Sequence, residues 1–289
     1  MSTNYFFVSS PLHLLFSSNL ALRHDSDYNI IVLMPRENRQ FSPFADLLAQ
    51  DTSIFAEVIS FETGNRRGKF AERRRRMGVI RNALVERPAD RIFTGTDRRV
   101  EFQYAMSVAS RLKPGVIGIY VDDGMASYLG HKSMHNIAHR YIDPLFKKLT
   151  YGWWWSNPLI IGCSAWISEA HVAYPDLVHE LLKSRKVVPI DRDVFKDPRF
   201  IELCQRLLQS RNVDDRSARD VDVIIVLTHE SFYPDADAHL KGLVDAVLQH
   251  DPSLGIAVKA HPRSEKTDKY RAMFPDILFL DSKVSMELY

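Results

Sequence analysis

The sequence predicts an α/β protein of two Rossmann-like domains, in which helices cover parallel sheets. Three observations predict this fold. Short apolar runs alternate with helix-like stretches along most of the chain, as expected for strands and helices that follow one another. Several of these runs are apolar at every position, which is typical of strands buried on both faces of a sheet. The chain has 289 residues, which exceeds one ordinary core and suits two domains.

The first strand and helix are marked most clearly. An apolar run at 5–8 is followed by Ser9, Ser10 and Pro11, and then by spaced leucines. Serine caps helices and proline suits their first turn, so this segment predicts a strand, a turn and a helix. By the same criteria we expect strands at 29–34, 55–61, 91–94 and 115–121, and helices at 44–48, 69–86 and 101–112.

The middle of the chain is less regular. Residues 131–185 contain Trp153-Trp154-Trp155 and several histidines, and we expect helices at 134–150 and 170–185. Residues 191–220 are rich in charge, and we interpret them as the crossover between the domains. The sequence therefore predicts a first domain at 1–190 and a second at 191–289.

The second domain is expected to repeat the α/β pattern. We expect strands at 221–227, 255–259 and 277–280, and helices at 236–250 and 265–273. The residues at 285–289 look like the opening of a further helix. Three strands and an unfinished helix lead us to expect that this domain is truncated or is completed by a partner.

Composition indicates a soluble globular protein. Hydrophobic residues make up 45% and charged residues 26% of the chain. We find neither a signal peptide nor an apolar run of about 20 residues, the length that spans a bilayer. Cys163 and Cys204 lack the spacing of a metal site. A reduced, cytoplasmic protein is the simplest interpretation.

Positive charge is concentrated in one segment. Residues 66–76 contain seven arginines and lysines, with Glu72 as the only acid, although the net charge is only +2. Such a field favours an anionic partner, such as an acidic glycan, a membrane surface or nucleic acid. A solvated helix face without a ligand explains the run equally well.

Two polar motifs follow apolar runs at positions where α/β sheets bind ligands. Asp122-Asp123-Gly124 follows the run at 115–121, and His261-Pro262-Arg263 follows the run at 255–259. A carboxylate can remove a proton from a hydroxyl, and histidine and arginine can stabilise a departing phosphate. Each motif alone is a common turn. Together, one in each domain, they indicate glycosyl transfer from an activated donor.

These motifs resemble those of the bacterial sialyltransferase superfamily, which includes the lipooligosaccharide sialyltransferases and the capsular polysialyltransferases. Those enzymes have an acidic-acidic-Gly motif in the first half and a His-Pro motif in the second. The start of the chain, residues 6–15, is also similar to the polysialyltransferase-like family, and residues 32–39 resemble a stretch of the lipooligosaccharide enzymes. The resemblance implies a GT-B fold, in which two Rossmann-like domains face each other across a cleft.

The resemblance also implies roles for individual residues. Asp122 is expected to be the base on the acceptor hydroxyl, with Asp123 as the second choice, and His261 to assist the departure of CMP. Further contacts to the nucleotide are expected from Pro262, Arg263, Glu287, Thr228 and Lys259. Contacts to the acceptor are expected from Ser9, Ser10, Arg36 and Asn38. The family's Ser/Thr-Ser pair, which binds the CMP phosphate, would lie beyond the last residue printed here.

The implied activity is a metal-independent, inverting transfer of sialic acid from CMP-sialic acid to a surface glycan, in capsule or lipooligosaccharide. No metal or other cofactor is expected, and association with the inner face of the cytoplasmic membrane is expected from the partners. Asp235 and Asp237 form no sugar-nucleotide motif, because acids are common at the start of a helix.

Several alternatives stay open. The donor could be another CMP-activated acid, such as Kdo, or the chain could be a degenerate transferase that only binds glycan. Nucleic acid is not expected, because no known nucleic-acid fold accompanies the arginines. The three tryptophans could pack in the core or at an interface, stack against a sugar, or anchor the protein at a membrane surface. His131, His135 and His139 would share one helix face, where a polar surface is favoured over a zinc site. Ser9 and Ser10 could instead only cap the helix.

Overall fold

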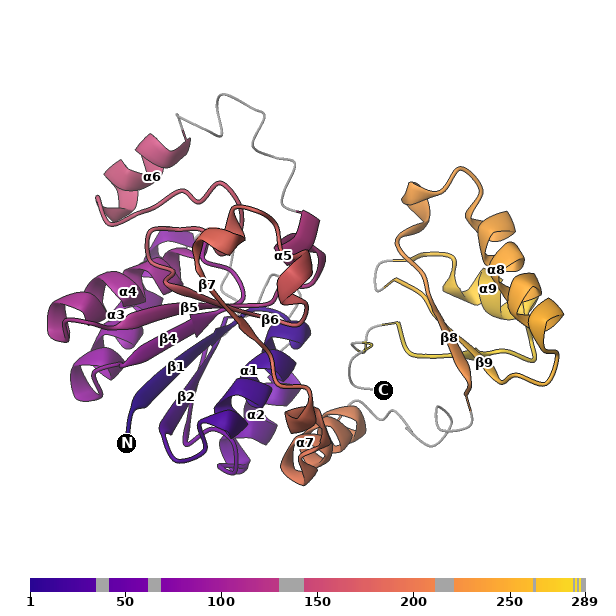
Figure 1. Cartoon of the computed structure of the whole chain (residues 1–289), viewed down its shortest axis with the longest axis horizontal. Helices are drawn as coiled ribbons and strands as arrows, with labels where there is room; N and C mark the ends of the chain where they lie inside the picture. Colours follow the sequence, from indigo (N-terminus) through magenta and orange to yellow (C-terminus); the bar gives the residue numbers. More distant parts are fainter. Residues whose placement is uncertain are drawn as a thin grey trace. The chain divides into compact units, whose positions relative to one another are not determined.

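The computed structural model describes residues 1–34, 42–61, 69–129, 143–210, 221–261, 264–282, 284 and 286. The chain divides into two compact units, Met1–Ile201 and Glu202–Tyr289. The boundary expected after residue 190 therefore lies inside the first unit. The assignment of an acceptor side and a nucleotide side to the two domains stays a prediction. Figure 1 shows both units, which are described separately below.

Unit 1 is built on a parallel sheet of seven strands within its described residues. The strand order is β3-β2-β1-β4-β5-β6-β7, and each neighbouring pair is parallel. The strands are β1 (Thr3–Val8), β2 (Tyr28–Leu33), β3 (Glu57–Ser60), β4 (Arg91–Thr94), β5 (Ile117–Val121), β6 (Glu169–Val172) and β7 (Lys186–Pro189). This sheet confirms the predicted α/β class.

Helices pack on both faces of this sheet, with α1 on one face and α3 and α4 on the other (Figure 1). The helices of unit 1 are α1 (Pro11–Arg23), α2 (Ser42–Gln50), α3 (Lys69–Glu86), α4 (Val100–Leu112), α5 (Met125–Leu129) and α6 (Asp143–Tyr151). Helix α7 (Pro198–Gln209) contains the boundary between the two units. Short 3₁₀ turns lie at η4 (Pro175–Leu177), η5 (Leu182–Ser184) and η6 (Asp193–Lys196). None of the described helices is long and apolar enough to cross a bilayer.

The core explains why the first strands are apolar at every position. Tyr5 and Phe7 belong to the hydrophobic cluster that includes Leu84 of α3 and Phe102 of α4. Phe6, between them in β1, points to the other face and stacks on Phe93 with ring centroids 4.4 Å apart. Side chains alternate across a strand, so a strand covered on both faces needs apolar residues throughout.

The predicted cap of the first helix is confirmed. The hydroxyl oxygen of Ser10 accepts a hydrogen bond from the backbone N–H of His13 at 3.2 Å, and Pro11 begins α1. The capping bond satisfies one of the donors that a helix start leaves unpaired. It fixes the position of α1 immediately after β1.

The helix predicted at 170–185 is wrong. This stretch contains β6 and the turns η4 and η5, and β7 follows it. Pro175 interrupts any helix there, because proline lacks the N–H that a helix interior requires. β6 is only four residues long, and its pairing with β5 and β7 defines it. Most of the helix expected at 134–150 lies outside the described residues, and its described end is α6.

Unit 2 contains a smaller sheet of the same kind. Its described strands are parallel in the order β10-β9-β8, with bounds β8 (Val223–Val226), β9 (Ile256–Lys259) and β10 (Leu278–Phe279). The other elements are η8 (Glu230–Phe232), α8 (Ala236–His250) and α9 (Thr267–Met273). Leu240, Val244 and Tyr270 pack from the helices against strand residues such as Val258. These elements match the expected strands and helices closely.

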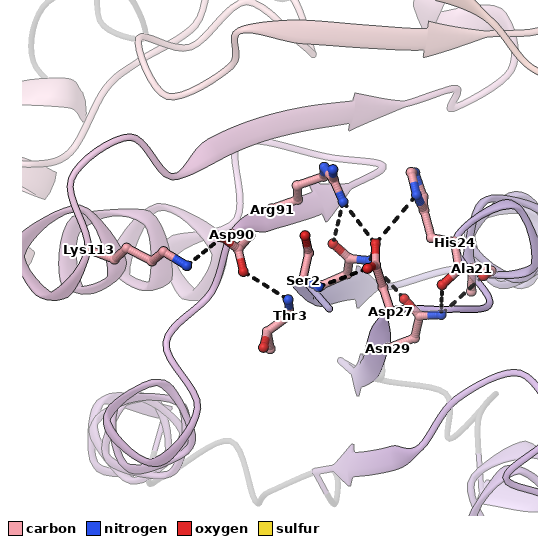
Figure 2. Close-up of polar contacts among 10 residues, drawn as sticks. Ser2, Thr3, Ala21, His24, Asp27, Asn29, Asp90, Arg91 and Lys113 are labelled. Carbon is pink, nitrogen blue, oxygen red and sulfur yellow. Dashed lines mark hydrogen bonds and ion pairs between the residues drawn. The ribbon is translucent and has the colours of Figure 1, made fainter.

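The amino ends of β1, β2 and β4 are joined by polar contacts (Figure 2). Asp27 accepts hydrogen bonds from the backbone N–H of Ser2 at 2.8 Å and from Arg91 at 3.1 Å. Asp90 accepts one from Lys113 at 2.5 Å and one from the N–H of Thr3 at 2.9 Å. These bonds from Lys113 and Thr3 lower the pKa of Asp90. The charged cluster therefore lies at the opposite ends of these strands from the predicted site.

Candidate active site

The carboxyl ends of β1, β4 and β5 lie next to one another at one edge of the unit 1 sheet. The chain passes from β1 to β2 on one side, whereas β4 pairs with β1 on the other, so the strand order reverses between β1 and β4. Open α/β sheets bind ligands at such a reversal. Ser9 and Ser10 follow β1, Gly95 follows β4, and Asp122 and Asp123 follow β5. The predicted acids and serines therefore meet where a ligand is expected.

Asp122 lies in a buried network that uses both oxygens of its carboxylate, and the residue is only 1% exposed. Oδ1 accepts hydrogen bonds from the N–H of Gly124 at 2.9 Å and from the hydroxyl of Ser127 at 2.6 Å. Oδ2 accepts one from the N–H of Ala173 at 2.9 Å and one from the hydroxyl of Tyr128. Four donors thus hold the carboxylate, which joins the turn after β5 to the chain after β6.

Tyr128 is held as a neutral donor in this network. Burial raises its pKa, and the hydrogen bond to Asp122 and the charge of that carboxylate act in the same direction. Burial likewise raises the pKa of Tyr120, whose hydroxyl lies 2.9 Å from that of Ser127. Both tyrosines keep their protons at neutral pH, so they supply hydrogen bonds and no charge.

Asp123 differs from Asp122 in exposure and in contacts. Its side chain is 20% exposed. Its Oδ1 lies 2.5 Å from Nε2 of His13, and its backbone N–H donates to the hydroxyl oxygen of Ser127 at 3.2 Å. Among the described residues, none donates a hydrogen bond to its Oδ2. Gly124 follows in the left-handed region, with φ at 63°, which permits the sharp turn predicted for this motif.

His13 is a residue that the sequence did not single out. Its side chain is completely buried, and its Nδ1 lies 3.2 Å from the hydroxyl oxygen of Ser9. A Cβ atom on Gly95 would lie only 2.2 Å from the imidazole, so the ring packs directly against the backbone after β4. The position of His13 in the first turn after the cap Ser10 is the one sequence signal that could have identified it.

Unit 2 carries its polar residues at the carboxyl ends of β8 and β9. His261 follows β9, and its ring lies at 82° to that of His229, with centroids 5.3 Å apart. The Nδ1 atom of His229 accepts a hydrogen bond from the N–H of Ser231 at 3.2 Å. In the neutral imidazole, this bond leaves the proton on Nε2. The sequence did not identify His229, although it lies three residues after β8.

The other predicted residues of unit 2 have local partners. Thr228 donates from its hydroxyl to the hydroxyl of Tyr233 at 2.9 Å. Lys259 is 5% exposed and donates to the carbonyl of Ser282 at 3.3 Å, so it fixes the chain beyond β10. Asp235 caps α8 by accepting from two backbone N–H groups, the structural role expected for an acid at a helix start.

Several predicted residues lie outside the described residues. They are Arg36, Asn38, Pro262, Arg263, Glu287, His131, His135 and His139. The adjacent tryptophans have different environments. Trp155 is buried in the core, whereas Trp153 is 75% exposed. Both cysteines are free, and the described residues include no group of three potential metal ligands.

The arrangement in unit 1 can accept a proton from a ligand. Asp122 has no unused lone-pair direction toward solvent, since four donors surround it. Asp123 is partly exposed at the reversal of strand order and has one oxygen without a donor among the described residues. A general base must be accessible, so that the ligand's proton can come within hydrogen-bond distance, and must have an oxygen free to accept it. Asp123 meets both requirements among the described residues.

No model of a known protein family matches the sequence, and comparison with curated proteins gives no match. Solved structures do match. An α/β-galactoside α-2,3-sialyltransferase from the marine bacterium Photobacterium phosphoreum is 12% identical, with a TM-score of 0.62 over 100% of this chain and 82% of that chain. The UDP-GlcNAc 2-epimerase of Neisseria meningitidis is 9% identical, with a TM-score of 0.52 over 97% of this chain and 72% of that chain. At these identities the likeness shows the fold, and this chain has the α/β fold of GT-B glycosyltransferases.

Proposed function

We propose that this protein is an inverting, metal-independent glycosyltransferase that moves sialic acid from CMP-sialic acid to a hydroxyl of a surface glycan, in capsule or lipooligosaccharide. The proposal combines the fold with the chemistry of the two strand edges. A bacterial sialyltransferase and a UDP-GlcNAc epimerase both share the fold, so the fold alone leaves the donor open. The Asp-Asp-Gly and His-Pro motifs favour the sialyltransferase chemistry.

The observation that carries the proposal is the contrast between two adjacent carboxylates. Asp122 is buried and bonded by four donors, whereas Asp123 is partly exposed and keeps an available oxygen. This contrast reverses the choice made from the sequence, in which Asp122 was the favoured base. Asp123 is the base in the proposed reaction, and Asp122 holds the turn that presents it.

The proposed reaction needs one proton transfer on the acceptor side. Asp123 removes the proton from the acceptor hydroxyl. The oxygen of that hydroxyl forms a bond to the anomeric carbon of sialic acid at the same time. The bond from that carbon to the CMP phosphate breaks, and its electrons leave with CMP. Attack from the face opposite the leaving group inverts the anomeric configuration. The proton ends on Asp123 and passes to solvent.

His261 and His229 suit the donor side of the proposal. Imidazole N–H groups stabilise phosphate charge, and the neutral tautomer of His229 carries its proton on Nε2. His261 follows β9, at the edge where α/β sheets bind nucleotides. Thr228 directly precedes His229 in the loop that follows β8.

We further propose that the protein works at the inner face of the cytoplasmic membrane. Helix α6 and Trp153, two residues beyond it, expose apolar side chains, with Phe146 at 62%, Leu149 at 71% and Trp153 at 75%. Lys147 and Lys148 flank them, and Lys148 lies 5.8 Å from the centre of the Trp153 ring. Apolar and aromatic side chains edged by lysine suit a membrane with anionic lipids.

Two variants test the site. Asp123→Asn should reduce release of CMP from CMP-sialic acid in the presence of acceptor by about 10²–10⁴-fold, because amide nitrogen cannot accept the proton. Asp122→Asn should cause a clearly smaller loss at a temperature where it remains folded. Circular dichroism checks the fold of both variants. Near-full activity of Asp123→Asn would show that this residue is not the base.

A further inference from the structure

We propose that His13 is a positioning residue for the base, which holds Asp123 by one oxygen and leaves the other oxygen for the acceptor hydroxyl. The inference rests on the proposed function. It starts from a contact that no sequence motif predicted: the buried imidazole of His13 lies 2.5 Å from Oδ1 of Asp123.

The proton in this contact can be assigned. A carboxylate only accepts hydrogen bonds, so the nitrogen that faces Asp123 must carry a proton. In the neutral imidazole Nδ1 then has no proton and accepts. The hydroxyl of Ser9, 3.2 Å from Nδ1, is the group placed to donate to it. The three residues form a chain in which Ser9 donates to His13 and His13 donates to Asp123.

The backbone is shaped for this contact. His13 comes from α1, after β1, and Asp123 follows β5, so the imidazole must cross the end of the intervening strand β4. Gly95 lies at that end, and a Cβ there would approach the ring to 2.2 Å. Because Gly95 has no side chain, His13 of α1 can pass the end of β4 and reach Asp123, which follows β5.

The neighbouring titratable groups do not replace His13. Asp122 lies in the same turn, Tyr120 of β5 contacts the hydroxyl of Ser127, and Tyr128 of α5 donates to Asp122. The tyrosines remain neutral because burial raises the pKa of each, and the carboxylate of Asp122 is engaged by its own donors. Among the described residues, His13 is the only side chain that donates to the carboxylate of Asp123.

This placement has a consequence for catalysis. The bond from Nε2 to Oδ1 fixes the rotation of the carboxylate before the acceptor binds. The acceptor proton then moves to Oδ2, and His13 neither gains nor loses a proton. An error of about 1 Å in the position of a base can cost about 10²-fold in rate. Loss of His13 should therefore reduce kcat more than it changes KM.

The test uses two independent ways to remove the contact. His13→Leu deletes the donor, and Gly95→Ala displaces the imidazole while His13 is retained. Both should lower kcat by about 10- to 100-fold with little change in KM for CMP-sialic acid. His13→Gln, whose amide can donate, should recover part of the loss. Ser18→Ala is the matched control, because Ser18 is also buried on α1 but bonds only the carbonyl of Leu14.

A second measurement does not depend on turnover. Nitrogen-15 spectra of the imidazole should show a protonated Nε2 and an unprotonated Nδ1 at neutral pH in the intact protein, and Asp123→Ala should change the Nε2 signal. An unprotonated Nε2, or a kcat of His13→Leu equal to that of Ser18→Ala, overturns the role of His13. Failure of the intact protein to use any CMP-sugar would overturn the proposed function instead. In that case the spectra would still show whether His13 donates a hydrogen bond to Asp123.

Discussion

Two identical side chains in sequence have different chemistry because their surroundings differ. Asp122 points into the protein and meets four donors, whereas Asp123 is partly exposed and meets His13. The sequence located the pair at the end of a strand but could not distinguish its members, since the donors come from distant segments. Ala173, for example, lies beyond β6, a strand that the sequence did not predict.

This contrast predicts a difference in stability. Asp122→Asn replaces one acceptor oxygen with an NH₂ group that faces a backbone N–H, that of Gly124 or that of Ala173, so a buried N–H loses its acceptor. The free energy of unfolding should fall by about 1–3 kcal/mol. Asp123→Asn keeps an oxygen that can accept from His13 and should cost less. Urea denaturation of both variants measures the difference. Equal stability of the two variants would contradict the buried role of Asp122.

At the scale of elements, prediction succeeded where local signals were strong. The helix at 69–86 was predicted with its observed bounds, and the cap Ser10 and the apolar strands β1, β2 and β5 were all recognised. The strands β6 and β7 were missed, because their sequences, EAHV and KVVP, mix apolar residues with charged residues, histidine or proline, and because their pairing is not local. His13 and Gly95 were missed for a related reason. Their contact depends on the order of the strands, which the sequence does not display.

Helix α6 carries the prediction for membrane binding. Phe146→Glu combined with Leu149→Glu should weaken binding to phosphatidylglycerol vesicles by at least about tenfold, because charged side chains replace the apolar ones that would enter the interface. Leu177→Glu is the control, since Leu177 is 67% exposed on η4, outside α6. Vesicle sedimentation measures the binding. Unchanged binding of the double variant, or equal loss in the control, would contradict a role for this helix.

At the scale of the molecule, two parallel sheets of unequal size each present polar residues at the carboxyl ends of their strands. Unit 1 offers a carboxylate with an available oxygen, and unit 2 offers a pair of histidines. A transferase needs both functions, a base for the acceptor and donors for a departing phosphate. The fold is shared by a sialyltransferase and by a UDP-GlcNAc 2-epimerase, so the donor is the property that most needs a direct measurement.

That measurement is a comparison of donors with the intact protein. CMP-sialic acid, CMP-Kdo and UDP-GlcNAc are each incubated with an oligosaccharide acceptor, and the released nucleotide and the products are quantified by mass spectrometry. The account predicts release of CMP from CMP-sialic acid, dependent on acceptor, together with a sialylated product. Conversion of UDP-GlcNAc while CMP-sialic acid stays intact would contradict it.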